Sequence, residues 1–491
     1  MSGAAALVWR VIVRPAAFTT SAALAVLMCG GLLLTARPDA PRAPIAAAAA
    51  PTAAPQSGPC NTTKQNTPIT AALLTSGLPC DVNLRHPEDV KDVNVLQRAF
   101  DYYSWLTFLA LNAPAGGAIG SGPAVGGDGP TAWERWQDLF STMRPGGVPP
   151  PPFGHPLPPP AICPRAPSGA VVMQMIGKTP ETLQKPDVRI TNLPLRTGPV
   201  IDRNGHYARF QILLNQPMFA YIVNNKLYSK AVQQNFSSPV AFPRGDIAAG
   251  SSGSIVIKAS WKVLDPKDPS DAPNRFHTIA ALVYTPQSDS PPVRAECHQA
   301  RLGLVGLHIV HKTSTHPQWI WTTFEHVDNV PTPAEAKAPP TGRHYNFFNP
   351  ACPVTRCPWN AEPPRPWDPT KDPFPHGFRS QIVRTTTLPP PAVASVADLN
   401  PQFRKILGSS VWSNYELIST QWPSDAKNTI DPTGKPFPLF LANSTMETYD
   451  QGSPRFGNVP LSTSSCMACH GNATSLRGRP SDFTFVLTHA H

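Results

Sequence analysis

Charged residues are scarce in this sequence: Asp, Glu, Lys and Arg together make up 15% of its 491 residues. The formal net charge of +10 is scattered, and neither a basic run nor an aromatic-basic module appears, so nothing predicts a nucleic-acid partner. A basic face towards an acidic redox partner or an anionic membrane surface is one interpretation, and a solvated basic surface is the plainer one. A hydrolase triad, a phosphate-binding loop and a dinucleotide-binding glycine motif are also missing, so those enzyme classes have no support.

The chain has a single Cys-x-x-Cys pair, Cys466 and Cys469, and His470 follows it directly. Without a second such pair, a zinc site of four ligands is hard to complete, and the βαβ surround of a thioredoxin-like dithiol is not visible. Cys-x-x-Cys-His is the attachment signature of c-type haem, in which both thiols add to the haem vinyl groups. The sequence therefore predicts one covalent haem c, with His470 as an axial ligand of the iron.

A methionine is missing where an ordinary small cytochrome c would need one. Only 21 residues follow His470, and none is Met, so a class I cytochrome c fold is excluded here and a second axial ligand comes from upstream. Candidates are His308, His311 and Met446, followed by His326 or water at an open site. In a strand His308 and His311 point to opposite faces, whereas in a helix they share one; the neighbouring glycine and β-branched residues favour the strand. A hydrogen-bonded core histidine and an ordinary buried methionine are the competing interpretations.

Proline, in contrast, is abundant: 62 residues favour a loop-rich protein with short elements. At the N-terminus two arginines precede a long apolar run, so we expect residues 1–36 to be a signal peptide or an uncleaved anchor. An alanine- and proline-rich linker is expected over 37–59. A large body over 60–411 and a C-terminal haem-attachment segment over 412–491 complete the expected organisation. The body is then exported to the periplasm, either soluble or tethered.

The remaining cysteines agree with an oxidising compartment. Once Cys29 and the haem pair are set aside, six are left, enough for up to three disulfides. We expect Cys352–Cys357 as the first local bridge and Cys60–Cys80 as the next. Free buried thiols are the alternative.

Hydrophobic periodicity predicts both helices and strands. Helices are expected over 93–112, from Thr131, over 216–227 and at the end of 388–407. An Asn-Gly hairpin is expected near 201–213, with further strands over 254–264, 275–284, 301–312 and 319–326. The predicted fold class is α+β, with an antiparallel-sheet core, peripheral helices and many proline-rich loops.

Several sequence blocks, taken together with the haem motif, resemble a group of exported bacterial proteins described as cytochrome c family proteins. The blocks lie at 104–112, 133–136, 221–228, 257–264, 303–313, 319–329 and 443–449. The resemblance implies haem binding and electron transfer, and it assigns no substrate, catalytic residue or sixth ligand.

Function depends on how the iron is ligated. Two protein ligands favour one-electron transfer to a redox partner protein, which is the expected function. An open distal side suits a peroxidase- or oxidase-type oxidoreductase. A haem-based sensor or binding module is the third interpretation, and an apolar pocket remote from the haem would favour it.

Overall fold

The computed structural model describes residues 67–82, 91–114, 130–167, 169–177, 189–190, 193–194, 198–289, 292–374, 377–424, 435–452 and 464–491. The chain divides into two compact units, Met1–Pro55 and Gln56–His491. The expected signal or anchor, the linker and Cys60 all lie outside the described residues. Among the helices that are described, none has both the length and the apolar character needed to cross a bilayer.

A mostly antiparallel nine-stranded sheet forms the centre of the second unit, so the α+β prediction is confirmed. Its main path is β1 (Gln137–Asp138), β5 (Arg209–Leu214), β6 (Ile255–Val263), β10 (Glu296–His311), β11 (Ile320–His326), β12 (Tyr415–Pro423) and β13 (Pro436–Phe437). β7 (Thr278–Thr285) pairs with the first half of β10, and β2 (Val171–Met173) pairs with β7 in parallel. Two small ribbons join β3 (Arg189–Ile190) to β4 (Leu193–Pro194) and β8 (Ser288–Asp289) to β9 (Pro292–Val293).

Most expected helices form close to their predicted positions. These are α1 (Val93–Asn112), α3 (Gln216–Asn224) and α6 (Pro390–Leu407). Four further helices among the described residues were not predicted: α2 (Leu139–Thr142), α4 (Lys230–Asn235), α5 (Pro333–Lys337) and α8 (Cys466–His470). α1 begins where the Asp92 carboxylate accepts the Asn94 amide, which satisfies an otherwise unpaired donor of the first turn. The single helix expected from Thr131 is wrong: a 3₁₀ turn (Trp133–Arg135) is followed by β1, and Asp138 then caps α2.

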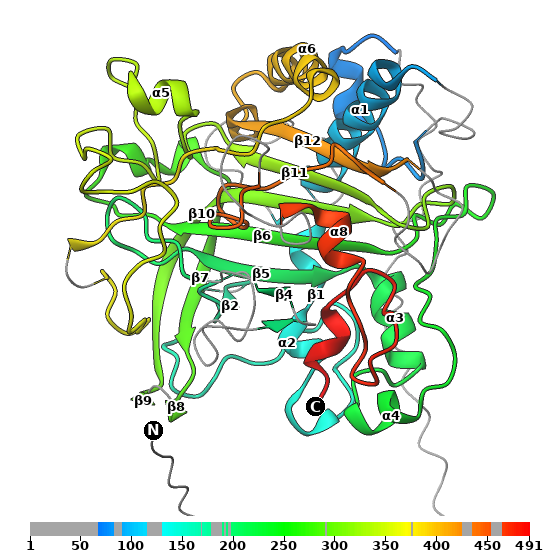
Figure 1. The fold of residues 1–491 in the computed structure, drawn as a ribbon. Helices are drawn as coiled ribbons and strands as arrows, with labels where there is room; N and C mark the ends of the chain where they lie inside the picture. Colours follow the sequence, from blue (N-terminus) through cyan, green and yellow to red (C-terminus); the bar gives the residue numbers. More distant parts are fainter. Residues whose placement is uncertain are drawn as a thin grey trace, which may run out of the picture. The chain divides into compact units, whose positions relative to one another are not determined.

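The sheet has two covered faces (Figure 1). We call one the α1 face, because α1 and α6 pack against it through a large, aromatic-rich core. We call the other the C-terminal face, because α3, α8 and the end of the chain pack against it through a second core cluster. Figure 1 shows the C-terminal segment, in red, crossing in front of the strands, while α1 runs behind them.

A β-bulge in β10 decides which side chains reach each face. The register with β6 shifts between Leu304 and Gly306, so Val305 is the extra residue. Leu304 before the bulge and Leu307 after it both belong to the α1-face core, although they are three residues apart. Because side chains alternate in a strand, the bulge reverses the alternation and turns His308 towards the C-terminal face.

Two disulfides link described segments. Cys352–Cys357 is present, which confirms the expected local bridge, and Cys163–Cys297 joins residues 134 apart in sequence. Cys80 is also disulfide-bonded, whereas its expected partner, Cys60, lies outside the described residues.

Candidate haem-attachment site

The Cys-x-x-Cys-His motif forms the short helix α8, which lies against β12 on the C-terminal face. The side chain of its N-cap residue, Ser465, does not form a capping hydrogen bond with the first turn. Instead, the Gln421 side chain from β12 accepts the Met467 amide at 2.7 Å and donates to Ser465 Oγ at 3.0 Å. A buried strand residue therefore supplies the cap that so short a helix needs.

The two cysteines lie three residues apart on α8, so their side chains leave the same side of the helix. Cys466 is half-buried, with Sγ 3.9 Å from the Leu441 carbonyl oxygen, and Cys469 is buried. The Cys466 sulfur therefore lies beside the loop that contains Leu441.

His470 is oriented by a backbone carbonyl. Its Nδ1 lies 2.8 Å from the Phe483 oxygen, which accepts only, so Nδ1 carries the proton and Nε2 keeps its lone pair. The rings of Trp321 and Phe485 flank the imidazole, with centroids 4.5 and 5.1 Å away. Burial lowers the pKa of His470 to about 4, so the ring is neutral at pH 7. A neutral imidazole with a fixed Nδ1–H is the form that ligates a metal.

These donors fit a c-type haem. Two thiols on one side of a helix match the two vinyl groups, and the histidine offers one nitrogen to the iron. Within the described ranges, no group of three or more His, Cys, Asp or Glu side chains has the arrangement of a metal-ion site.

Of the expected distal candidates, His308 lies on the same sheet face as His470. His308 Nε2 donates to Glu447 Oε2 at 3.0 Å, and Glu447 also accepts the Asn443 amide. Burial has the largest effect on the pKa of His470, the Phe483 hydrogen bond the next, and the charges of Lys258, Glu447 and His308 act on it more weakly. Lys258 is the cross-strand neighbour of His308 on β6.

His311 lies on the opposite face, as the strand interpretation predicted. Its Nδ1 contacts the Tyr103 hydroxyl of α1 and its Nε2 contacts the Ser252 carbonyl. Both ring nitrogens are thus engaged in the core, and the structure does not bring His311 towards His470. His326 is similarly engaged: Nε2 donates to the Arg275 carbonyl, and Nδ1 accepts the Asp328 amide.

Met446 is buried in a different apolar cluster. Its side chain, 4% exposed, packs with Val305, Phe210 and Ile382. The cluster beneath the haem motif instead contains Met467 and Trp321. The structure therefore places Met446 in the protein core next to the β10 bulge.

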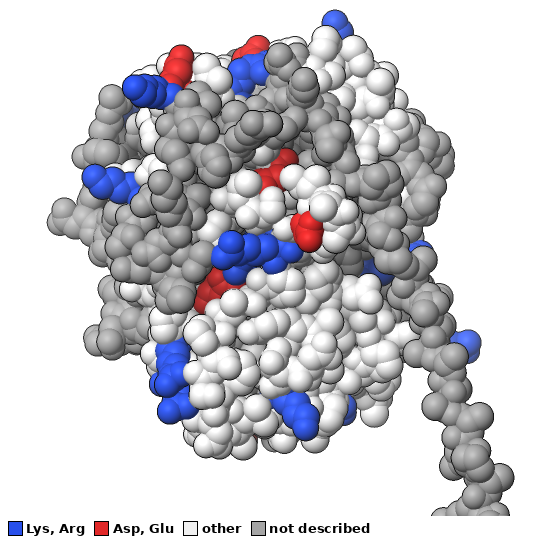
Figure 2. Space-filling view, turned by 90° about the vertical axis from the view of Figure 1, so that its right-hand side faces the viewer, with Lys and Arg blue, Asp and Glu red and all other residues white. Residues whose placement is uncertain are grey.

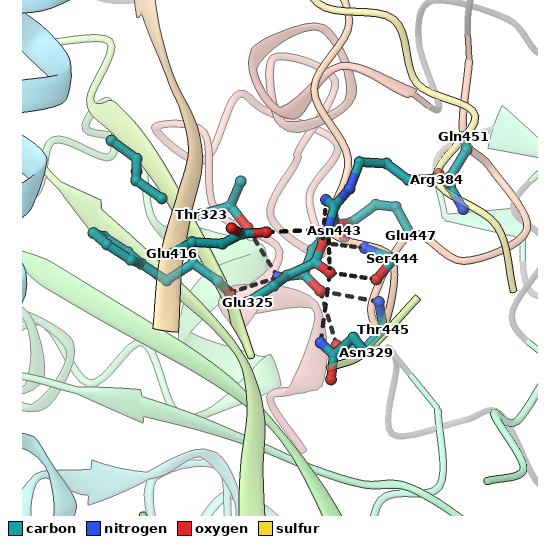
Figure 3. Close-up of polar contacts among 12 residues, drawn as sticks. Thr323, Glu325, Asn329, Arg384, Glu416, Asn443, Ser444, Thr445, Glu447 and Gln451 are labelled. Atoms are coloured by element: carbon teal, nitrogen blue, oxygen red, sulfur yellow. Dashed lines mark hydrogen bonds and ion pairs between the residues drawn. The ribbon is translucent and has the colours of Figure 1, made fainter. Parts of the chain in front are cut away.

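A buried polar network holds the 443–447 turn on the C-terminal face (Figure 3). Glu325, fully buried on β11, accepts two parallel hydrogen bonds from Arg384, each 3.0 Å long. The same carboxylate accepts the Ser444 amide at 2.6 Å and the Ser444 hydroxyl. Charge-assisted bonds of this kind are among the stronger ones in proteins. They fix the turn that carries Glu447 to His308.

Gly306 leaves room for this turn. A β-carbon at that position would lie 2.3 Å from Thr445 Oγ1 and 2.9 Å from Asn443 Oδ1. A larger residue would therefore push the turn off the strand. The sequence alone does not show that Gly306 has to be small, because the turn that contacts it lies more than 130 residues away along the chain.

A cavity of about 260 Å³ lies near Arg384 and is lined mainly by charged side chains. They include Glu335, Arg343, Arg384, Arg404 and Glu416. This cavity is polar, and so it differs from the apolar pocket that a haem-based sensor or binding module was expected to have.

Figure 2 shows one side of the molecule, on which the few charged residues that are described lie among larger areas of uncharged described residues. Near its centre, basic and acidic side chains lie next to one another. This arrangement matches the low and scattered charge of the sequence.

No family model, curated protein or solved structure matches this chain. The site must therefore be interpreted from its own geometry. Sequence reasoning missed Gln421, which caps α8, and Phe483, whose carbonyl orients His470. Neither has a recognisable signal, because one is a strand glutamine and the other acts through its backbone.

Proposed function

We propose that this chain is an exported monohaem c-type cytochrome that relays single electrons between periplasmic partners, as the resemblance to cytochrome c family proteins implies. Cys466 and Cys469 would hold the haem covalently, and His470 would ligate the iron. A haem bound there supplies a one-electron ferric/ferrous couple. The proposal rests above all on one observation: the Phe483 carbonyl fixes the Nδ1–H of His470 and leaves Nε2 available.

Other features support the same proposal. The disulfides Cys163–Cys297 and Cys352–Cys357 suit an oxidising compartment. An N-terminal signal or anchor over residues 1–36 would take the chain there. The low share of charged residues, 15% of the sequence, suits a transient redox partner better than a polyanion.

A second candidate function is a peroxidase- or oxidase-type oxidoreductase. The observation that favours it is the His308–Glu447 pair on the His470 side of the sheet. A histidine held by a carboxylate can accept and return a proton near a bound ligand. In that role His308 would assist chemistry at an open iron position rather than ligate the iron.

The first experiment tests haem attachment. The full chain is expressed in a haem-maturing periplasm and stained for haem after denaturing electrophoresis. We expect the wild type to stain, Cys466→Ala/Cys469→Ala to lose the stain completely, and Cys352→Ala/Cys357→Ala to keep it as the matched control. A stained band from the Cys466/Cys469 double variant would refute covalent attachment through these thiols.

The absorption spectrum then separates the two candidates. A low-spin spectrum that is indifferent to carbon monoxide supports two protein ligands and electron transfer. A high-spin spectrum that changes with carbon monoxide overturns simple electron transfer and favours the oxidoreductase, whose test is turnover of peroxide.

A further inference from the structure

Three non-glycine residues, two of them bulky aromatic ones, adopt left-handed backbone conformations at one place on the C-terminal face. They are Trp319, Asp482 and Phe483, with φ angles of 67°, 55° and 63°. Among the described residues only five non-glycine residues have positive φ, so three of the five lie in this contact cluster. Left-handed φ is unfavourable for bulky side chains and persists only where the surroundings enforce it.

Contacts of Asp482 with its surroundings hold this left-handed backbone in place. Its carboxylate forms an ion pair with Lys312 Nζ and accepts the Phe242 amide at 2.7 Å. Its carbonyl accepts the indole Nε1–H of Trp319 at 3.1 Å. Both charged side chains are only 2% exposed. The turn at Asp482 is therefore tied to the end of β10, to the loop at Phe242 and to Trp319.

The next residue in this turn is Phe483, whose carbonyl oxygen lies 2.8 Å from His470 Nδ1. Two successive left-handed residues set the direction of that carbonyl. If the turn relaxed to ordinary extended backbone, the oxygen would point elsewhere and His470 would lose its acceptor.

We propose that Lys312 and Asp482 are positioning residues for the proximal histidine: their buried ion pair holds the left-handed turn that aims the Phe483 carbonyl at His470. This inference rests on the proposed function, because His470 is taken as the haem ligand. Neither residue touches the haem. Their effect reaches the iron through the strength of one hydrogen bond, which raises the basicity of the imidazole and so favours the ferric form.

A merely structural ion pair is the competing explanation, and the chain offers a matched control. Lys262 on β6 is equally buried, at 1% exposed, and pairs with Asp271 and Asp202. It has no described contact with Asp482 or Phe483. Replacing either lysine by methionine removes one buried cation from the same sheet and leaves carboxylates without their partner.

The test compares Lys312→Met with Lys262→Met in the full chain carrying covalent haem. Haem staining first confirms attachment in the wild type; an unstained wild type overturns the proposed function and not the ion-pair geometry. In the stained proteins we measure the midpoint potential and the Soret circular dichroism. We expect Lys312→Met to raise the potential and change the Soret signal, because a weaker acceptor lowers the basicity of His470. We expect Lys262→Met to keep both at their wild-type values.

Equal potentials and equal Soret signals in stained Lys312→Met and Lys262→Met would overturn the proposal. If Lys312→Met does not accumulate, Asp482→Asn keeps the shape and the Phe242 contact while removing the charge, and the same upward shift is expected. Trp319→Phe removes the indole donor and replaces the ring that lies under Lys312 Nζ by a smaller one, and it should shift the potential in the same direction by less. An unchanged potential in both of these variants would also overturn it.

Discussion

On the α1 face, β11 presents Phe324 to Phe108 and Trp105 of α1, with ring centroids 4.2 and 4.9 Å apart. On the C-terminal face the same strand presents the fully buried carboxylate of Glu325, which binds Arg384 and Ser444. One face is closed by interlocking aromatic rings, and the other by ion pairs and strained backbone around a histidine. We therefore expect the stability of the fold to depend mainly on one side of these strands and the candidate chemistry on the other.

The largest expected effect comes from breaking the aromatic side. Phe108→Ala removes a fully buried ring and should lower the free energy of unfolding by about 3–5 kcal/mol. Phe485→Ala is the matched control, since this half-buried ring lies 5.1 Å from His470. It should cost less stability but alter the haem spectrum, which Phe108→Ala leaves unchanged. Urea unfolding and Soret spectra check both. A spectral change in Phe108→Ala alone would contradict the division between the faces.

An intermediate effect should appear in the pH dependence of stability. Burial lowers the pKa of His311 on the α1 face from 6.5 to about 4. As the pH falls below about 6.5, His311 is protonated in the unfolded chain but not in the folded protein, which favours unfolding. The free energy of unfolding is therefore highest above about pH 6.5 and falls as the pH drops towards 4. The full contribution is on the order of 3 kcal/mol.

His311→Gln should flatten that part of the curve. The groups facing His311 are the Tyr103 hydroxyl, the Ser252 carbonyl and the more distant Asp81, whose charge opposes the shift. Burial raises the pKa of Asp101 to about 6, which acts with the opposite sign but is common to both proteins. Denaturant midpoints between pH 4 and 7 give the comparison. Parallel curves for the two proteins would rule out His311 as the source.

The substitution with the smallest expected effect on stability, His308→Ala, should have a clear effect on the haem spectrum. His308→Ala loses one hydrogen bond to Glu447 and should cost about 1 kcal/mol. It should nevertheless change the haem spectrum or its response to carbon monoxide, because His308 lies on the His470 side. His311→Ala, on the other side, should leave both unchanged. If His308→Ala is spectrally silent, His308 is a core residue of the C-terminal face and not a distal one.

Much of the sheet could be predicted from sequence because its strands have clear apolar patterns. The region around His308 and His311 was expected to be a strand with the two histidines on opposite faces, and it is. Which histidine faces the haem motif could not be predicted. That depends on the bulge at Val305. Gly303 and Gly306 are compatible with a bulge in the run from Leu302 to Leu307, but the sequence does not say whether an extra residue is present or where it lies.

The haem motif could also be recognised in the sequence, whereas the residues that orient His470 could not. Lys312 and Asp482 are 170 residues apart, and each looks like an ordinary charged residue until the fold brings them together. The backbone is left-handed at Asp482 and Phe483, where no glycine in the sequence would have indicated it. Local patterns report secondary structure, but long-range ion pairs and backbone acceptors are decided by the tertiary fold.

The bulge has one more consequence, which concerns chain length rather than residue type. From Leu304 onward, every side chain of β10 is assigned to a face by whether its distance from the bulge is odd or even. Deleting Val305 would leave Gly306 to His311 opposite the same β6 residues and on the same faces, because the deleted residue is the one without a partner on β6. Natural relatives that lack the bulge residue should therefore still place the residues equivalent to His308 and His311 on opposite faces, each on the same face as here.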